Sequence, residues 1–278
     1  MKISEIPAAQ MLVKSNLPAS DYVANPYIGC PHRCRYCYAC FMKRFSGHGE
    51  DWGTFLDIKN YSNISIPKNL SGKTVLLSSV TDPYNPYEIK YHKSREVLER
   101  LCHSDANIEI LSKSDLMVSD LELLKQIPGL KVGISLSTLD DGFRKMMEPG
   151  APSVERRLKA LQTLHDNGVS TYLFISPIFP HVTDIKAIVE RVNNSVDKIC
   201  FENLNLRGGA KKEILDFIER EYPQFAQTYH DIYINGDISY WKQLEEEISE
   251  LLTKLHIPYQ NFFYHDKIKK KKGSVRVD

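Results

Sequence analysis

Short apolar segments alternate with segments of helical spacing over most of the chain. The apolar, β-branched runs predict strands, and they lie at 74–80, 107–114, 130–138, 170–180 and 198–206. The stretches between them predict helices, and these lie at 95–105, 120–127, 153–168 and 184–195. Ser153 is placed as the N-cap of the third helix, and Gly168 ends it.

This alternation predicts the fold class. Strand and helix follow one another at least four times, which indicates right-handed βα units around a parallel sheet or barrel. The segment NPYIGC at 25–30 is expected as the first strand, with a cysteine-rich loop at its carboxyl end. After residue 206 the pattern changes to helices at 210–223 and 240–256, and a basic tail begins at Lys267. We expect an N-terminal extension at 1–21, a core barrel at 22–206 and a helical C-terminal extension with a basic tail at 207–278.

Composition narrows the class of protein. The 278 residues suit one large α/β domain, and 42% apolar residues is ordinary for a globular protein. The net charge is +1, so no global field attracts nucleic acid. No apolar run approaches the roughly 20 residues that cross a bilayer, and the N-terminus lacks the apolar core of a secretion signal. We expect a cytoplasmic protein without a membrane partner, in which the cysteines stay reduced.

Polar clusters follow each expected strand. In parallel βα folds, functional sites collect at the carboxyl ends of the strands. Strand ends are also polar simply because they leave the core, so a single cluster carries little weight. Six clusters that converge on one rim favour a site there, and they lie at 30–40, 78–84, 112–115, 135–138, 177–184 and 202–205.

The first cluster carries the most specific chemistry. Cys30, Cys34 and Cys37 have the spacing C-x3-C-x2-C. Three thiolates on one tight loop suit three irons of a [4Fe–4S] cluster and leave the fourth iron open for another ligand. Cys40 offers a fourth thiol, so a zinc site or a closed four-cysteine cluster are the alternatives. Zinc ligands usually come as two separated pairs, which favours the three-cysteine interpretation.

This motif resembles the signature of the radical S-adenosylmethionine (SAM) superfamily. Three later segments, SSVTDPYNPYE, ILSKSD and GISLST…MEPGAPSVERRLKAL, resemble its spore photoproduct lyase-like branch, also called DNA repair photolyase-like, from about residue 22 to 206. The stretch from KSNLP to GEDWGTF is similar to radical SAM mobile pair protein B. The resemblance implies a partial (β/α)6 barrel, a [4Fe–4S] cluster and SAM, which is cleaved to a 5′-deoxyadenosyl radical that abstracts hydrogen from a substrate.

The resemblance also implies roles for individual residues. Cys30, Cys34 and Cys37 match the cluster ligands, and Tyr36 and Tyr38 match aromatic rings near the adenosyl group.

Other matched positions would contact SAM directly. Lys113 matches a lysine that meets the SAM carboxylate, and Ser135 matches a serine that binds the ribose, with Ser137 as the alternative. Arg157 matches an arginine on the SAM side, with Arg156 as the alternative.

Three further positions carry weaker assignments. Thr81 and Asp82 lie where the SAM amino group is expected, although TDPY is also an ordinary turn sequence. Glu148 is either a site residue or a surface carboxylate.

One position departs from the branch. Where spore photoproduct lyase has a cysteine that donates hydrogen to the product radical, this chain has Ser79. A hydroxyl O–H bond is too strong for that role, so the same repair cycle is not expected unless another group replaces the thiol. The nearest candidates in the sequence are Cys40, Tyr38, Tyr84 and Tyr87.

The substrate and partners stay open at this point. A DNA lesion would need a basic face with aromatic rings, and only FMKRF at 41–45 and the lysine run at 267–272 offer such charge. A peptide or a small metabolite fits equally well. The Gly-rich stretch 47–55 either lines the substrate pocket or covers the bottom of the barrel. The resemblance implies a reductant such as flavodoxin or ferredoxin and a partner radical SAM protein; a non-catalytic iron–sulfur protein is the alternative class.

Overall fold

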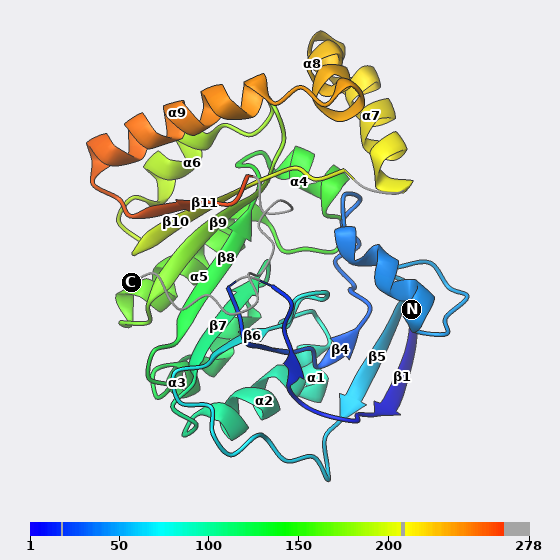
Figure 1. Ribbon diagram of the computed structural model, residues 1–278, viewed down its shortest axis with the longest axis vertical. Helices are drawn as coiled ribbons and strands as arrows, with labels where there is room; N and C mark the ends of the chain where they lie inside the picture. Colours follow the sequence, from blue (N-terminus) through cyan, green and yellow to red (C-terminus); the bar gives the residue numbers. More distant parts are fainter. Residues whose placement is uncertain (18, 207–208, 264–278) are drawn as a thin grey trace.

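The computed structural model describes residues 1–17, 19–206 and 209–263, and its main feature is one large curved sheet (Figure 1). The strand order is β11-β10-β9-β8-β7-β6-β3-β2. From β3 to β11 neighbouring strands are parallel, and β2 is antiparallel at one edge. The sheet is open, with β2 and β11 as the edge strands among the described residues. The predicted α/β class with an incomplete barrel is confirmed. The strands are β2 (Val13–Lys14), β3 (Tyr22–Ala24), β6 (Thr74–Leu77), β7 (Asn107–Ser112), β8 (Lys131–Leu136), β9 (Thr171–Ile178), β10 (Lys198–Asn203) and β11 (Tyr259–Asn261).

Helices cover the outer side of this sheet, with α7, α8 and α9 gathered at one end of the molecule (Figure 1). The helices are α1 (Glu88–Tyr91), α2 (Lys93–Leu101), α3 (Leu121–Leu124), α4 (Asp141–Met147), α5 (Val154–Asp166), α6 (Ile185–Val192), α7 (Gly209–Glu221), α8 (Ala226–His230) and α9 (Ser239–Leu255). Segments of 3₁₀ helix are η1 (Tyr38–Phe45), η2 (Leu116–Asp120) and η3 (Pro223–Phe225), and η4 (Asp231–Asn235) is a π-helical turn.

The α5 helix shows how the sequence sets these elements. Ser153 is its N-cap, and the Ser153 side chain accepts a hydrogen bond from the Arg156 backbone N–H, as predicted. Leu158, Leu161 and Leu164 recur at helical spacing and are buried in the main core cluster. Beyond the helix end, Gly168 adopts a left-handed φ of +79°, a conformation that favours glycine.

The strands present alternate residues to two environments. In β8, Val132, Ile134 and Leu136 join the core under the helices, whereas Gly133 and Ser135 lie on the opposite face. The Tyr172 ring lies across Gly133, where an added Cβ would come within 2.2 Å of the ring. The Tyr172 hydroxyl donates to the Ile110 carbonyl at 3.3 Å. An aromatic ring therefore fills this part of the barrel interior.

The predicted first strand is wrong in detail. The strand that joins the parallel sheet is β3 at Tyr22–Ala24, not 25–30. Pro26 interrupts the chain, since it has no backbone N–H for a sheet ladder. The following residues, β4 (Tyr27–Ile28), pair antiparallel with β5 (Phe55–Asn60), which also pairs with β1 (Lys2–Pro7). These three strands form a small second sheet beside the cysteine loop.

Other elements differ from their predicted bounds. The strand predicted at 74–80 stops at Leu77, because Ser78 has a left-handed φ of +68°. The helix predicted at 120–127 is reduced to the single turn α3 after η2. The C-terminal part is not purely helical, since β11 pairs with β10. The basic tail lies outside the described residues.

Candidate active site

The cysteine loop, which contains Cys30, Cys34 and Cys37, is a series of tight turns between β4 and η1. The Arg33 backbone N–H donates to the Cys30 carbonyl at 3.3 Å, and the Cys37 N–H donates to the Cys34 carbonyl at 3.1 Å. The three thiols are partly exposed at the residue level. Burial in the surrounding protein raises the pKa of Cys30 to about 12, and it raises the pKa of Cys34 and of Cys37 as well. The charge of Lys113 opposes this rise at Cys34 and Cys37, but burial outweighs it.

Two glycines allow neighbouring chain segments to approach the loop. Gly29 has a φ of +93°, and an added Cβ would lie 2.4 Å from the Phe55 carbonyl oxygen. On the other side, the Gly150 N–H donates to the His32 carbonyl at 2.9 Å. An added Cβ on Gly150 would lie 2.2 Å from the Pro31 carbonyl oxygen. The loop is thus held between β5 and the segment that follows α4.

The chemistry of these donors fits an iron–sulfur cluster better than a single ion. Within residues 1–17, 19–206 and 209–263, no three ligating side chains converge on one metal position. In a cluster each iron takes one cysteine, so its ligands need not converge in this way. Cys30, Cys34 and Cys37 are close enough for their charges to interact, and Cys40 also lies close enough to interact with Cys37, although it is exposed on η1. The zinc alternative gains no support from this arrangement.

His32 adds a polar group that the sequence analysis missed. Its ring is almost completely buried, at 1% exposure, and its Nδ1 atom lies 3.3 Å from Asp82. The Nε2 atom has no hydrogen-bond partner. A buried polar atom without a partner is unusual and calls for a ligand or a water molecule. Its position inside the C-x3-C motif was the available signal.

A row of polar side chains crosses the carboxyl ends of the parallel strands. The Lys113 ammonium donates to Ser135 Oγ at 2.7 Å, and Ser135 Oγ donates to the Ser176 carbonyl at 3.1 Å. The Ser176 hydroxyl in turn donates to Glu202 at 2.6 Å. Lys113 and Ser135, which were predicted separately, therefore lie in direct contact. Ser176 and Glu202 extend the row; Glu202 belongs to the predicted polar cluster 202–205, whereas Ser176 lies just before the cluster 177–184 and was missed.

Beside this row lies a buried charged group built around Glu148. The Arg157 guanidinium contacts Glu148 at 2.5 Å, the Tyr36 hydroxyl donates to the same carboxylate, and Lys113 lies 3.9 Å away. Burial alone would raise the pKa of Glu148, but the charges of Arg157 and Lys113 outweigh it and hold the pKa below its ordinary value. Glu148 is therefore a buried carboxylate rather than a surface one.

The structure shows where the alternatives at two of the predicted positions lie. Arg157 is fully buried against Glu148, whereas Arg156 is exposed and pairs with Asp115. Ser135 contacts Lys113, whereas Ser137 lies 3.5 Å from Glu148. Burial thus distinguishes Arg157 from Arg156, whereas both serines lie at the site, Ser135 in the row and Ser137 beside its charged neighbour. Their roles toward SAM stay predictions.

The side chains of Asp82 and Thr81 stabilise the turn in which they lie. The Asp82 carboxylate accepts hydrogen bonds from Ser112 Oγ and from the backbone N–H groups of Lys113 and Tyr84, and it contacts His32. Burial opposes its ionisation, but His32 and these hydrogen bonds lower the pKa of Asp82 to about 2. The Thr81 hydroxyl donates to the Gly29 carbonyl at 2.6 Å. These contacts fix the Thr81–Asp82 turn against the cysteine loop.

The candidate hydrogen donors near Ser79 differ in position. Tyr38 is 58% exposed and its hydroxyl donates to the Ser79 carbonyl, so it stands next to the position of interest. Tyr84 is fully buried and donates to Asp120 at 3.0 Å, which takes its hydroxyl into the helix-packing core. Of these two tyrosines, only Tyr38 borders Ser79.

Comparison with known proteins gives the family of this chain. The model of the radical SAM superfamily matches residues 24–192, more than half of the chain. The chain belongs to the radical SAM superfamily. Members of this superfamily use a [4Fe–4S] cluster and SAM, and the matched segment contains the cysteine loop and the polar row as far as Ser176. The protein MJ0683 of Methanocaldococcus jannaschii is 32% identical over 91% of this chain and 95% of its own length.

Solved structures agree with the fold. Spore photoproduct lyase complexed with a dinucleoside spore photoproduct has a TM-score of 0.68 at 14% identity, covering 94% of this chain and 82% of that one. Streptococcus suis SuiB bound to S-adenosylmethionine has a TM-score of 0.53 at 14% identity, covering 86% and 46%. A phage M6 protein named radical SAM Nalpha-GlyT isomerase is 27% identical over 61% of this chain and 36% of its own length.

Among the described residues, no helix is long and apolar enough to span a membrane.

Proposed function

We propose that this chain is a radical SAM enzyme in which Cys30, Cys34 and Cys37 bind three irons of a [4Fe–4S] cluster. With one electron from a reductant, the bound cluster would cleave SAM to methionine and a 5′-deoxyadenosyl radical for hydrogen abstraction from a substrate. The observation that carries the proposal is the position of the cysteine loop. It lies at the carboxyl edge of the sheet, where Lys113 and Tyr36 both contact the buried Glu148 group.

The chain's own residues would bind and orient SAM. Lys113 offers an ammonium group for the SAM carboxylate, a charge-assisted pairing. Its present hydrogen bond to Ser135 brings a hydroxyl suited to the ribose next to it. Glu148 and Arg157 hold Tyr36 in place, and Tyr36 and Tyr38 lie beside the third cysteine. We assign Thr81 and Asp82 to supporting the turn rather than to the SAM amino group, because their polar atoms already have partners within the protein.

The domain boundaries follow from this assignment. The core at 22–206 would hold the cofactors, and the segments 1–21 and 207–278 would support it. β1 supports this for the N-terminal segment, since it pairs with β5 beside the cysteine loop.

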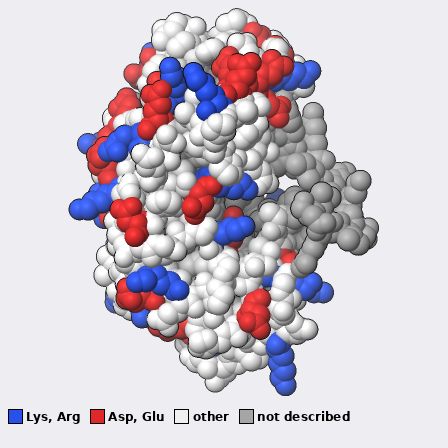
Figure 2. All heavy atoms as spheres, turned by 90° about the vertical axis from the view of Figure 1, so that its left-hand side faces the viewer, with Lys and Arg blue, Asp and Glu red and all other residues white. Residues whose placement is uncertain are grey.

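The alternatives to this proposal are a DNA lesion lyase and a non-catalytic iron–sulfur protein. The likeness to spore photoproduct lyase supports a DNA lesion lyase. Two features disfavour it, namely Ser79 in place of the hydrogen-donating cysteine and the mixed surface charge. Figure 2 shows Lys, Arg, Asp and Glu interspersed over one face of the molecule, without a continuous basic surface. A non-catalytic iron–sulfur protein would not need Lys113, Ser135 and Arg157 to gather beside the cysteine loop. A reductant and a second radical SAM protein are the partners that we expect.

Formation of 5′-deoxyadenosine tests the proposal. The anaerobically reconstituted and reduced protein is incubated with SAM and with no DNA, unirradiated DNA or UV-irradiated DNA. We expect 5′-deoxyadenosine in all three reactions and none with Cys34→Ala. A rise with irradiated DNA alone would support lesion repair instead. Absence of 5′-deoxyadenosine from a protein that contains the cluster would contradict the enzyme proposal.

A further inference from the structure

The segment around the cysteine loop is cationic, although the whole chain is nearly neutral. Residues 22–49 include four cationic side chains and no acidic one. The cationic side chains are Arg33, Arg35, Lys43 and Arg44. Arg35 and Lys43 each lie 3.5 Å from a carboxylate. In the part of the chain that the structure describes, no carboxylate pairs with Arg33 or Arg44. The segment therefore keeps positive charge without a local counter-charge.

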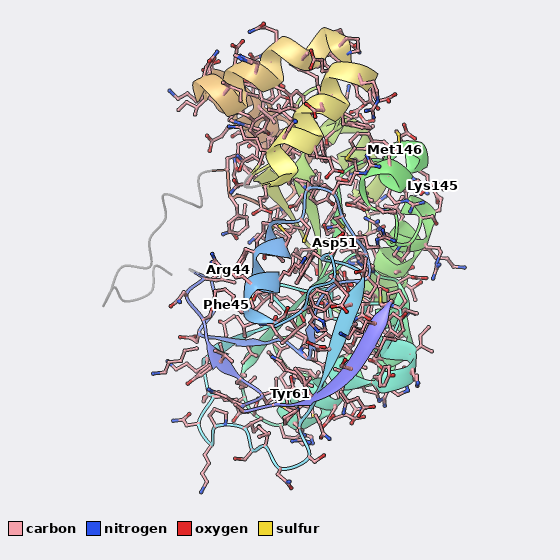
Figure 3. The ribbon with its side chains drawn as sticks, turned by 90° about the vertical axis from the view of Figure 1, so that its right-hand side faces the viewer. Arg44, Phe45, Asp51, Tyr61, Lys145 and Met146 are labelled. Carbon is pink, nitrogen blue, oxygen red and sulfur yellow. The ribbon has the colours of Figure 1, made fainter. Side chains whose placement is uncertain are left out.

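The η1 helix begins directly after the third cysteine and leaves most of its side chains exposed. Cys37 is its N-cap, and Ala39 is the one buried residue among its eight. Phe41 is 42% exposed and Phe45 is 67% exposed. The Arg44 guanidinium lies 5.5 Å from the first ring centroid and 4.7 Å from the second, so it stacks against both rings. Figure 3 labels Arg44 and Phe45 at the end of this helix.

The Gly-rich stretch at 47–55 fixes the position of η1 relative to the cysteine loop. It joins η1 to β5, and Asp51 marks its course in Figure 3. Gly53 has a φ of +88°, and an added Cβ there would lie 2.6 Å from Arg33 Cγ. The stretch therefore packs against the cysteine loop and does not cover the bottom of the barrel.

We propose that Phe41, Arg44 and Phe45 form the docking surface, here called the η1 surface, for an acidic one-electron carrier protein that reduces the cluster. The proposal rests on the proposed function in one respect, that the cysteine loop binds the cluster. In this step the carrier loses one electron and the cluster gains it, and no bond is formed or broken.

The position of the η1 surface suits electron transfer. Phe41 follows Cys37 by four residues, which is about 8 Å along a 3₁₀ helix that rises about 2.0 Å per residue. Electron transfer slows steeply as the distance grows. A carrier that docks on the η1 surface would therefore be close to the cluster ligand Cys37.

Charge and surface chemistry favour such a carrier over other occupants. Exposed aromatic rings and arginine are typical of protein interfaces, and a cationic surface steers an acidic partner towards it. A second copy of this chain would use the same surface on both subunits, which would place Arg44 opposite like charge. A nucleic-acid strand needs a track of cations along its phosphates, whereas two of the four cations here already pair with carboxylates.

Binding of carriers to a charge-reversal variant tests the η1 surface. The probes are an acidic flavodoxin and an acidic ferredoxin, and calorimetry at low salt gives the Kd of each for the reconstituted protein. We expect a complex with the wild type, and Arg44→Glu should raise the Kd by about tenfold. Phe45→Ala should also raise the Kd, because it removes an exposed apolar contact. At about 0.15 M salt the effect of Arg44→Glu should shrink, because the Debye length is then about 8 Å.

Arg191→Glu is the matched control. Arg191 lies on α6, which covers the outer side of the large sheet away from η1 (Figure 1), and its side chain is 54% exposed. The same change of charge there should leave the Kd at the wild-type value.

A second readout uses the rate of 5′-deoxyadenosine formation with the reduced carrier, divided by the rate with dithionite. Dithionite is a small reductant that needs no docking surface. In Arg44→Glu this ratio should fall by about tenfold. A general loss of activity would lower both rates and leave the ratio unchanged.

Several results would overturn the docking surface. One is an equal effect of Arg44→Glu and Arg191→Glu, since net charge alone would then explain it. Another is the absence of binding of either carrier to the wild type. A wild-type dimer in sedimentation that Phe45→Ala dissociates would assign the surface to a second copy. Binding of a single-stranded oligonucleotide that Arg44→Glu abolishes, with carrier binding unchanged, would assign it to nucleic acid.

The two proposals can fail separately. If the protein that contains the cluster forms no 5′-deoxyadenosine with any reductant, the enzyme proposal fails. Carrier binding that Arg44→Glu weakens and Arg191→Glu does not would still support the η1 surface. If the enzyme is active but its binding to carriers is unaffected by Arg44→Glu and Phe45→Ala, the docking surface is overturned and the enzyme proposal stands.

Discussion

Arg157 and Glu148 form an ion pair in which neither side chain is exposed to solvent, with 2.5 Å between guanidinium nitrogen and carboxylate oxygen. Tyr36, beside the third cysteine of the loop, donates to the same carboxylate. A helix residue is thereby linked through one buried carboxylate to the cysteine loop. Because a buried charge without a partner is costly, this pair allows a quantitative prediction.

Arg157→Met should destabilise the fold by about 3–5 kcal/mol, since it leaves Glu148 buried without its main partner. The free energy of unfolding from urea titration measures this. The neighbouring Arg156→Met is the control: Arg156 is 59% exposed and pairs with Asp115 at the surface, so its loss should cost about 0–1 kcal/mol. Equal costs for the two variants would contradict the assignment of Arg157 as the inward residue.

The three-ligand assignment predicts different effects at two cysteines of the same segment. Cys34→Ala should abolish both the brown colour of the reconstituted protein and the cleavage of SAM, because one iron loses its thiolate. Cys40 is exposed on η1, so Cys40→Ala should keep the colour. Iron and sulfide analysis measures the cluster content of each variant. A colourless Cys40→Ala protein would show that the fourth thiol takes part.

Gly150 offers a steric test of how the loop is held. Alanine there would place its Cβ 2.2 Å from the Pro31 carbonyl oxygen and 2.9 Å from His32 Cα, both backbone atoms that cannot turn aside. We expect Gly150→Ala to cost about 1–3 kcal/mol and to lower the iron content after reconstitution. Gly49 has open space around its Cβ direction, so Gly49→Ala is the matched control. The idea fails if both variants retain iron like the wild type.

The sequence predicted most of the parallel sheet because its strands are buried runs that alternate with amphipathic helices, and burial gives a clear periodicity. It could not predict that NPYIGC leaves this sheet, because a two-residue strand that pairs with β5 depends on long-range contacts. At the candidate site, the cysteine spacing and Lys113 could be recognised as motifs in the sequence. The contact between Ser176 and Glu202 could not, since it joins strand ends 26 residues apart.

His48 gives a prediction for the dependence of stability on pH. Burial opposes its charge, but the hydrogen bonds that the ring donates to Asp57 and Glu50 outweigh this and raise the pKa of His48 above its ordinary value. Glu50 stays ionised throughout, because Lys2 and other partners lower its pKa to about 2. A raised pKa means that the folded state binds the proton more tightly than the unfolded chain does. The stabilisation is therefore complete below the unfolded pKa of about 6.5 and is lost as the pH rises through the higher folded pKa.

The comparison with His48→Gln isolates this contribution. Urea titrations of the apoprotein under reducing conditions, at about pH 6 and about pH 8.5, give the difference in unfolding free energy between wild type and variant. That difference should be larger at the lower pH, because only there does His48 carry its full charge between Asp57 and Glu50. His103→Gln, at an exposed position, should show no such change. A difference that grows with rising pH would mean that His48 packs as a neutral ring, and that Asp57 is balanced by some other group.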